Sequence, residues 1–463
     1  MRYTLTFRDK QYEELCAHLF QAGQRSERAA FLLCGIAHTD SETRLLVREA
    51  ILVPDSELLD QSNHHLSVAA SSFLRVMKRT DRERGCFVFV HSHPADVPEH
   101  SKQDDIEEAA LFRTAYNRIN TPNAVHASIV LSDPALPRGR VWLDGGKVEQ
   151  LDLVRVIGRR FRFFPRAGFD RSIDTRFHDR EVRAFGPDIL PLLQQLTVGV
   201  VGAGGTGSSV FEQLVRLGVG RILVADGQRL EHSNVSRVYG SEIDDVGVDK
   251  SSLLSKMARH IGLGTVVEHF SKPVTYASIM KRFRTCDVIF GCTDDFWGRS
   301  ALTRFAIEYC VPVIDLGVKI NSNVGKIEAI PGRITTLLPG KPCLYCRGQI
   351  TAEDVQQQIL QEISPEEAEY QRREGYIPEL PDAEPAVIPF TTATAAFAIA
   401  EFLHRLTGFK GEDYDLGEIV LRFDETVVRT PGALQNPECF CSDSSLIAKG
   451  DSVRFLDQTW RPE

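Results

Sequence analysis

The sequence predicts an α/β protein in which a mixed α/β domain is followed by a domain with a doubly wound parallel sheet. Its 463 residues exceed what one hydrophobic core usually supports. With 43% hydrophobic and 25% charged residues, it has the composition of an ordinary globular protein. From residue 176 onward, apolar strand-like runs alternate with helical patterns, which is typical of parallel strands joined by crossover helices.

Residues 1–150 form the first predicted domain. Apolar runs and helical periodicity predict a helix at 10–23, strands at 29–35, 87–94 and 126–132, and a helix at 101–118. Residues 151–175 are basic and aromatic with a Pro and Gly interruption, so we expect a connecting segment whose apolar residues pack somewhere.

Residues 176–463 form the second predicted domain. We expect strands at 196–201, 221–226, 287–292 and 311–317, and helices at 208–218 and 390–406. The stretch 351–386 is a long polar crossover loop, and residues 353–384 hold ten acidic and two basic side chains. This stretch accounts for nearly all of the formal net charge of −9. The acidic stretch could attract a basic tail toward the pocket, or it could be a solvated loop without such a role.

Composition also narrows the function classes. There is no apolar run long enough for a membrane span, and Arg8, Asp9 and Glu13 interrupt any signal peptide, so we expect a cytoplasmic protein without a membrane partner. Without a basic face, nucleic acid is not an expected partner. Ten cysteines in a reducing compartment indicate thiols or metal ligands before disulfides.

Two histidines and an aspartate follow the apolar run of the first domain. His91 and His93 are two positions apart in extended chain, so their side chains lie on one side of a strand and can bind one ion. Asp104 opens the next helix and can supply a third ligand. Three protein ligands with one open position are typical of catalytic zinc. A surface loop that happens to carry His and Asp is the alternative.

The spacing HSHP, six residues, Ser, two residues, Asp resembles the motif of the JAB/JAMM (MPN+) metalloproteases, and "ERAAFLLCG" resembles their glutamate-bearing strand. The resemblance implies a JAB/MPN-like fold in which His91, His93 and Asp104 bind zinc. Glu27 would be the general base and Ser101 the hydrogen-bond donor to the oxyanion. Such enzymes cleave peptide or isopeptide bonds after the Gly-Gly tail of ubiquitin-like proteins.

A glycine-rich turn lies between the first strand and helix of the second domain. Gly202, Gly204 and Gly207 form GxGxxG, with Gly205 inside it. Glycines at this spacing permit a tight turn and close approach of backbone to a phosphate, and Asp226, at the end of the next strand, can bind ribose hydroxyls. On its own this motif also suits a dehydrogenase.

The residues that follow favour a polyphosphate site. Asn234, Arg237 and Lys250 come shortly after Asp226, and Asp294 ends a later strand. Two cations and a carboxylate near a nucleotide turn suit polyphosphate binding with Mg²⁺, whereas hydride transfer needs neither the carboxylate nor the extra cations. Each of these residues taken singly is better explained as a solvated surface charge, so the inference rests on their combination.

Residues 176–441 resemble the ThiF/MoeB/HesA family and the adenylation domains of ubiquitin-activating enzymes, which have a Rossmann-like fold. The resemblance implies that the glycine turn and Asp226 hold the nucleotide, that Asn234, Arg237 and Lys250 bind its phosphates, and that Asp294 binds magnesium. "RFHDREVRAFG" resembles the family's leading Arg-Tyr-x-Arg segment with one extra residue. The resemblance therefore implies a homodimer in which Arg180, or alternatively Arg176, reaches the partner protomer's ATP.

Two cysteine pairs flank the crossover region. Cys343 and Cys346 form CxxC, and Cys439 and Cys441 form CxC, a ligand set that predicts a closed structural zinc site. ThiF-like proteins often have two CxxC pairs, so the CxC is a departure. Residues 347–390 contain no cysteine, which leaves Cys292 as a candidate nucleophile and thioester formation open.

The combined prediction is a bifunctional enzyme that acts on the glycine-ended tail of a ubiquitin-like protein, by adenylation in one domain and by zinc-dependent cleavage in the other. A conjugating-enzyme-like partner would accompany it, and the fusion resembles arrangements in bacterial ubiquitin-like operons, some of them linked to antiphage defence. Activation and processing of a sulfur-carrier protein is a second reading. An inactive binding scaffold is a third.

Overall fold

The computed structural model describes residues 1–21, 26–61, 66–93, 97–166, 176–323, 325–374, 385–451 and 454–463. Contacts divide the chain into two compact units. The first comprises Met1–Asp170, Glu308–Cys310 and Ser445–Phe455, and the second comprises Arg171–Ile307, Val311–Ser444 and Leu456–Glu463. Among the described residues, no helix is long and apolar enough to cross a bilayer.

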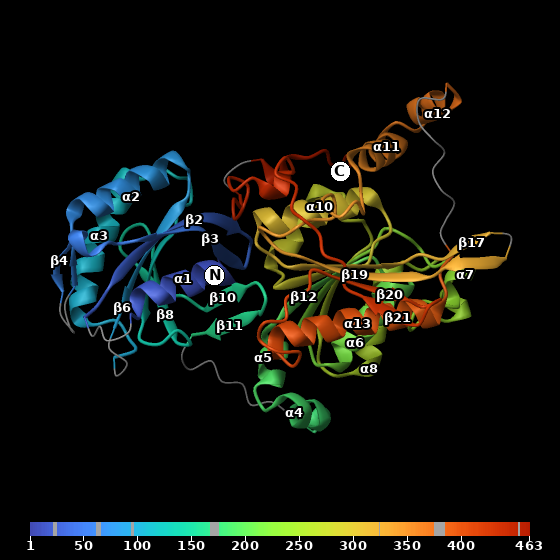
Figure 1. The fold of residues 1–463 in the computed structure, drawn as a ribbon, viewed down its shortest axis with the longest axis horizontal. Helices are drawn as coiled ribbons and strands as arrows, with labels where there is room; N and C mark the ends of the chain where they lie inside the picture. The colour runs from blue at the N-terminus through green and yellow to red at the C-terminus, as the bar shows by residue number, and fades with distance from the viewer. Residues whose placement is uncertain are drawn as a thin grey trace. The chain divides into compact units, whose positions relative to one another are not determined.

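The first unit is built on a nine-stranded mixed sheet (Figure 1). In spatial order its strands are β11 (Arg162–Pro165), β10 (Leu153–Ile157), β1 (Arg2–Arg8), β3 (Glu42–Leu52), β2 (Ala29–His38), β6 (Cys86–Ser92), β7 (His126–Leu131), β8 (Pro137–Trp142) and β9 (Val148–Gln150). A small hairpin of β4 (Leu58–Gln61) and β5 (Leu66–Val68) stands apart from this sheet.

Both faces of the sheet carry apolar cores because its central strands are buried on both sides. Helix α1 (Asp9–Leu19) packs through Tyr12 and Leu15 into the core of one face. Helices α2 (Ala70–Arg82) and α3 (Lys102–Arg118) pack through Met77 and Phe112 into the core of the other. The face covered by α2 and α3 also carries the predicted metal ligands.

The segment 151–175, expected to connect the domains, differs from that expectation. Its described part contains β10 and β11, and every residue of β10 is buried. β10 pairs in parallel with β1, so these residues belong to the first sheet. The alternation of arginine and apolar residues in "LVRVIGRRFRFFP" is a strand pattern, and the high basic content concealed it.

The second unit has an eight-stranded sheet whose first five strands are parallel. In spatial order its strands are β14 (Val266–Phe270), β13 (Arg221–Ala225), β12 (Thr197–Val201), β15 (Val288–Gly291), β16 (Val313–Val318), β19 (Pro331–Leu337), β20 (Glu418–Arg422) and β21 (Val427–Arg429). A separate hairpin joins β17 (Asn321–Asn323) and β18 (Lys326–Ala329). The predicted α/β class with a doubly wound second domain is confirmed.

Helices cover both faces of this sheet (Figure 1). The helices of the second unit are α4 (Asp179–Phe185), α5 (Ile189–Gln195), α6 (Gly205–Arg216), α7 (His232–Val235), α8 (Lys250–Ile261), α9 (Ala277–Arg282), α10 (Phe296–Glu308), α11 (Ala352–Ile363), α12 (Pro365–Arg373) and α13 (Ile388–Thr407). α13 packs against α6 on one face, and α10 covers the other (Figure 1).

The crossover stretch 351–386 is helical over much of its length rather than a loop. Thr351 caps α11 by accepting a hydrogen bond from the backbone of Asp354, and a proline at the start of α12 favours a new helix there. Residues 375–384 of this stretch lie outside the described residues. The acidic composition suggested a loop, whereas the capping signals Thr351 and Pro365 indicate helices.

Candidate functional sites

The first candidate site lies where β6 ends and α3 begins. His91 and His93 leave the end of the strand with their Nε2 atoms 3.0 Å apart. Both are buried, with 2% and 7% of the residue exposed. The Nδ1 of His93 lies 3.2 Å from the Val97 carbonyl oxygen, which can only accept. Nδ1 therefore carries a proton, and Nε2 is the nitrogen that faces Asp104 and could bind a metal ion.

Asp104 is brought to the histidines by the start of α3. The Ser101 hydroxyl accepts a hydrogen bond from the Asp104 backbone, and the Asp104 carboxylate accepts one from the Ser101 backbone at 2.6 Å. This capping box holds the Asp104 oxygens 3.2 Å from His91 Nε2 and 3.4 Å from His93 Nε2. One ligand atom from each of the three residues lies within 4.8 Å of the others, which suits a single ion.

Glu27 faces the same site from the chain just before β2. Its Oε1 is 3.9 Å from His93 Nε2, and 7% of the residue is exposed. Glu27, Ser101 and the three candidate ligands line one cavity of about 100 Å³, which also has apolar walls from Phe89 and Val97. The structure therefore brings together all five residues that the sequence assigned to this site.

The carboxyl group of Asp104 and the ring of His93 shift each other's pKa values toward the charged forms. Burial disfavours a charged Asp104, but hydrogen bonds from His91 and His93 outweigh it and hold the carboxyl pKa below its ordinary value. Burial also opposes protonation of His93, yet Asp104 and Glu27 raise its pKa above the ordinary value. Two histidines beside the carboxylates of Asp104 and Glu27 match the donor set of a divalent cation.

Sequence analysis missed the support behind this site. His100 packs edge-on against the His91 ring, with centroids 6.4 Å apart, and its Nε2 lies 3.3 Å from the Ser128 hydroxyl. Ser128 in turn hydrogen-bonds the buried Glu108, which also accepts from Trp142 at 3.0 Å. The sequence contains one sign of this support: Glu108 is four positions after Asp104, so both carboxylates lie on the same face of the predicted helix.

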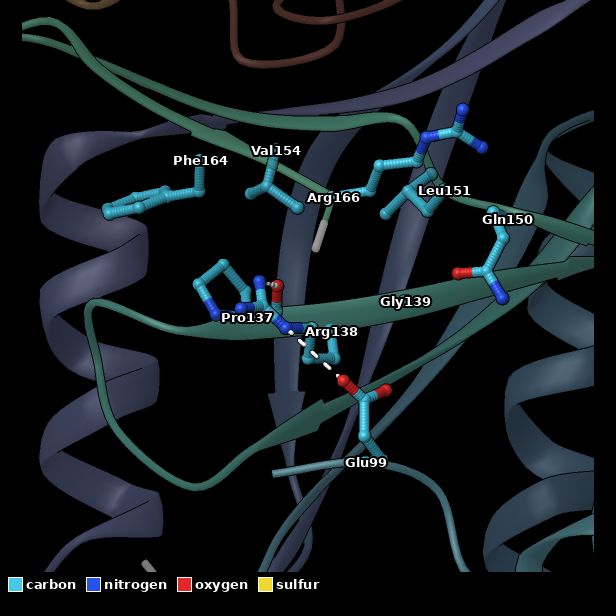
Figure 2. Close-up of a pocket in the computed structure, with 9 residues that line it drawn as sticks. All are labelled: Glu99, Pro137, Arg138, Gly139, Gln150, Leu151, Val154, Phe164 and Arg166. Atoms are coloured by element: carbon cyan, nitrogen blue, oxygen red, sulfur yellow. Dashed lines mark hydrogen bonds and ion pairs between the residues drawn. The ribbon is translucent and has the colours of Figure 1, made fainter. Parts of the chain in front are cut away.

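A larger hollow of about 150 Å³ in the first unit contains none of the predicted residues. Figure 2 shows it between β8 and the β10–β11 pair, with Arg138 3.6 Å from Glu99 at its edge. Its remaining walls are mainly side chains without acid–base or nucleophilic chemistry. We therefore place the candidate chemistry at the histidine cavity, although it is smaller.

The second candidate site lies at the carboxyl ends of the parallel strands. β12 is flanked by β13 on one side and β15 on the other, so the strand order reverses there. Ligands of doubly wound sheets bind at this switch point. Gly202 follows β12 with a φ of 92°, and a Cβ there would lie 2.6 Å from the Cys292 carbonyl oxygen. A Cβ at Gly207 would lie 1.9 Å from the Gly202 oxygen, so both positions require glycine.

Gly204 differs from these two glycines. A Cβ added there would meet nothing within 4 Å, so the space in front of the turn is open. Gly204 directly precedes α6, whose first backbone N–H groups are available to an anion. Gly205 packs beside Arg237, whose side-chain carbons would lie 3.4 Å from a Cβ at that position. The turn thus has one packed side and one open side.

Asp226 and Lys250 flank this turn. The Asp226 carboxylate accepts hydrogen bonds from the backbone of Ala203 at 2.6 Å and of Gln228 at 2.7 Å. Burial raises the pKa of Asp226 despite those bonds and the nearby Lys250 charge, and Asp294 adds to the rise. Lys250 is buried and donates to the Gln228 side chain at 2.7 Å. Lys250 and Asp294 are therefore each within electrostatic reach of Asp226.

Asn234, Arg237 and Asp294 complete the predicted set. Asn234 is buried in α7, where its side chain accepts a hydrogen bond from the Glu231 backbone. Arg237 donates to the Ser233 carbonyl oxygen at 2.7 Å and reaches the glycine turn. Asp294 follows β15 and is exposed. Two cations and an exposed carboxylate near an open glycine turn fit a magnesium-bound triphosphate. The side-chain hydrogen bonds that Asn234 makes with described residues are within its own short helix and do not reach the turn.

Arg180 lies apart from this set, in the short helix α4. It is exposed, and it makes no hydrogen bond or ion pair with any residue that the structure describes. Arg176 stacks on the Phe177 ring, with 5.9 Å between guanidinium and centroid. Because its side chain is exposed and has no partner among the described residues, Arg180 is available to a second molecule.

We predict that Gly204→Ala weakens nucleotide binding without affecting folding. The methyl group would enter the open space before the turn, so ATP affinity should fall by at least about tenfold while the unfolding temperature changes little. Isothermal titration with Mg·ATP measures the first effect and thermal melting the second. Gly207→Ala, by contrast, should destabilise the second unit. Unchanged ATP affinity in Gly204→Ala would contradict this assignment of the turn.

A third cluster joins the two cysteine pairs. Sγ of Cys343 is 3.6 Å from that of Cys439, and Sγ of Cys346 is 3.4 Å from that of Cys441. All four sulfur atoms lie within 4.8 Å of one another. Burial raises the pKa of Cys439, whereas hydrogen bonds from Cys343 and Gln435 lower that of Cys441. A bound zinc ion would supply the positive charge that lets four thiolates coexist.

Metal analysis tests both metal clusters together. We predict two zinc ions per chain in the intact protein, one after Cys346→Ser, and two after Cys16→Ser, which alters a thiol outside both clusters. Inductively coupled plasma mass spectrometry gives the stoichiometry. One zinc ion in the intact protein would show that one of the two clusters is not a zinc site.

Cys292 has the character of a structural thiol. It packs beside Gly207, and burial raises its pKa above the ordinary value, with Asp315 adding to the rise. The thiolate is the nucleophilic form of cysteine. A raised pKa therefore disfavours thioester formation on this residue.

Two family models match this chain, one over its first part and one over its second. The sequence model of the ThiF family matches residues 178–440, more than half of the chain. The model of the prokaryotic homologs of the JAB domain matches residues 9–137. In crystal structures, MccB from E. coli with ATP shares 16% identity with this chain, covering 58% of it and 74% of MccB, with a TM-score of 0.44.

Curated relatives match through the ThiF region. The SAMP-activating enzyme E1 of Haloferax volcanii is 29% identical over 38% of this chain and 63% of its own length. The ubiquitin-like modifier-activating enzyme 5 of Culex quinquefasciatus is 28% identical over 36% and 44%. The sulfur carrier protein ThiS adenylyltransferase of Bacillus subtilis is 29% identical over 37% and 49%. The chain thus spans less than two thirds of the length of each.

Proposed function

The chain belongs to the ThiF family and carries a JAB-like domain before its ThiF region, and on this premise we propose a bifunctional enzyme that acts on the tail of a ubiquitin-like protein. The second unit adenylates the terminal glycine. The first unit cleaves the peptide or isopeptide bond after that glycine. Both reactions take place at the same tail carbonyl.

The observation that carries the adenylation is the convergence of the open glycine turn, Asp226, Lys250 and Asp294 at the switch point of the sheet. In the reaction, a carboxylate oxygen of the tail attacks the α-phosphorus of ATP, and the bond to the β-phosphate oxygen breaks to release pyrophosphate. Negative charge grows on the phosphate oxygens, where Arg237 and Lys250 would stabilise it. A magnesium ion held by Asp294 would neutralise further phosphate charge.

Arg180 would complete this site from a second protomer. Its exposure, and its lack of a partner among the residues described, support a contact made in trans. A homodimer follows from this proposal, because each nucleotide site would then need the arginine of the neighbouring chain.

The cleavage is supported by the geometry of His91, His93, Asp104 and Glu27 within one cavity. A zinc ion bound by the first three would acidify a water molecule in its open coordination position. Glu27 would take the proton of that water and pass it to the leaving amine. Ser101, which uses its oxygen to cap α3, retains its O–H to donate to the oxyanion.

Activation of a sulfur carrier is the second candidate function. The 29% identity to the sulfur carrier protein ThiS adenylyltransferase favours it as much as the other relatives favour protein tagging. Both begin with the same acyl adenylate. They differ afterwards, because sulfur transfer ends in a thiocarboxylate and tagging ends in an amide.

Intact mass spectrometry tests the proposal. The chain is incubated with ATP, Mg²⁺ and a ubiquitin-like protein with a glycine-ended tail encoded close to its gene. We expect the tail to gain the mass of AMP, and a variant of the partner without its last glycine to gain nothing. With a sulfurtransferase added, replacement of a tail oxygen by sulfur would identify the second function. If neither an AMP adduct nor pyrophosphate release is found, adenylation is excluded.

A further inference from the structure

Helix α11 contacts the start of α10, directly after the turn that carries Asp294. Helix α10 begins at Phe296, and its first backbone N–H groups have no partner within the helix. The side-chain oxygen of Gln358, in α11, accepts hydrogen bonds from Phe296 N at 2.7 Å and from Trp297 N at 3.1 Å. The crossover helix thus caps α10 two residues after Asp294.

Arg461 holds α11 in this position. The Gln358 amide donates to Glu362 at 2.9 Å, and Glu362 forms an ion pair with Arg461. The Arg461 guanidinium also lies over two aromatic rings, 5.6 Å from the centroid of Trp297 and 5.8 Å from that of Tyr276. One arginine therefore contacts both the helix that provides the cap and a residue of the capped turn.

Backbone contacts fix the segment that carries Arg461. Its N–H donates to the Thr275 carbonyl oxygen at 3.0 Å, and the buried Trp297 donates through its indole N–H to the Thr459 carbonyl oxygen at 3.2 Å. Glu463 binds elsewhere, accepting from the Ser278 backbone at 3.0 Å and from its hydroxyl at 2.8 Å. The segment Leu456–Glu463 therefore makes one set of contacts with the start of α10 and with α11, and another with Ser278 in α9 through Glu463.

We propose that Arg461 is a positioning residue that fixes the Asp294 turn, through Glu362 and Gln358, for the binding of magnesium with ATP. This inference rests on the proposed adenylation. A carboxylate on an ordered turn loses less conformational freedom when an ion binds, so the ion binds more tightly. The acidic crossover stretch then has a structural purpose, because Glu362 and Gln358 connect the segment to the site.

The test compares Arg461→Ala with Glu463→Ala. Both variants loosen the same segment, but only the first loses contact with α11 and Trp297. We expect Arg461→Ala to raise the Mg²⁺ concentration needed for half-maximal ATP binding about tenfold. Hydrogen exchange in residues 293–298 should become faster, while β12 and β13 remain protected. Glu463→Ala should change neither quantity. Calorimetry with Mg²⁺ and ATP supplies the first measurement and needs no turnover.

Gln358→Ala provides an independent route if Arg461→Ala fails to fold. It removes the cap and leaves Arg461 next to Trp297. We expect it to raise the Mg²⁺ requirement for ATP binding as much as Arg461→Ala does. Equal Mg²⁺ requirements in wild type, Arg461→Ala and Gln358→Ala would overturn the inference, as would exchange that rises throughout the second unit. If the wild-type chain itself binds no Mg·ATP, the proposed function fails, which is a distinct result.

Discussion

Asp294→Ala is expected to reduce ATP–pyrophosphate exchange at least about 100-fold, because its carboxylate is the proposed magnesium ligand and the phosphates would lose a major neutralising charge. The exchange is measured with labelled pyrophosphate and the ubiquitin-like partner. Because Asp294 is exposed, its loss should leave the unfolding temperature close to that of the wild type.

Asp244→Ala is the matched control for this variant. Asp244 is also an exposed carboxylate of the second unit, but it lies outside the candidate site. It should retain wild-type exchange. Exchange that persists in Asp294→Ala would remove this residue from the mechanism, and with it the premise that Arg461 acts through the Asp294 turn.

Glu27→Gln is expected to lower cleavage of a tail-extended ubiquitin-like protein about 10²- to 10⁴-fold, because an amide cannot accept the proton of the attacking water. The substitution preserves size and leaves His91, His93 and Asp104 in place. Zinc content should therefore equal that of the wild type, whereas His91→Ala should lose both cleavage and one zinc ion.

Glu14→Gln is the control for the first unit, because Glu14 lies exposed on α1 and pairs only with Lys10 among the residues described. It should cleave at the wild-type rate. Retained cleavage in Glu27→Gln would assign the base to another group, and cleavage that survives in His91→Ala would remove the metal site from the reaction. The adenylation should be unaffected by any of these variants.

Local patterns in the sequence were sufficient for the fold class and for most of each candidate site. The spacing from His91 to Asp104 and the glycine turn at 202–207 are short stretches whose geometry is set by one strand, one turn and one helix start. Such geometry depends on nearest neighbours and capping, which the residue types specify directly. The positions of Asp226 and Asp294 just after β13 and β15 followed from the same alternation of β and α.

Only the tertiary structure decided the relations between distant segments. It places β10 and β11 in the first sheet, brings Cys343 and Cys346 to Cys439 and Cys441, and lets Gln358 cap α10. It also shows that Glu108 supports His100 through Ser128. These contacts join residues as far apart in the chain as Thr4 and Leu153, and their formation depends on packing that no local pattern encodes. The sequence by itself therefore determined which candidate site residues the chain carries, and the tertiary structure decided which other residues hold them in place.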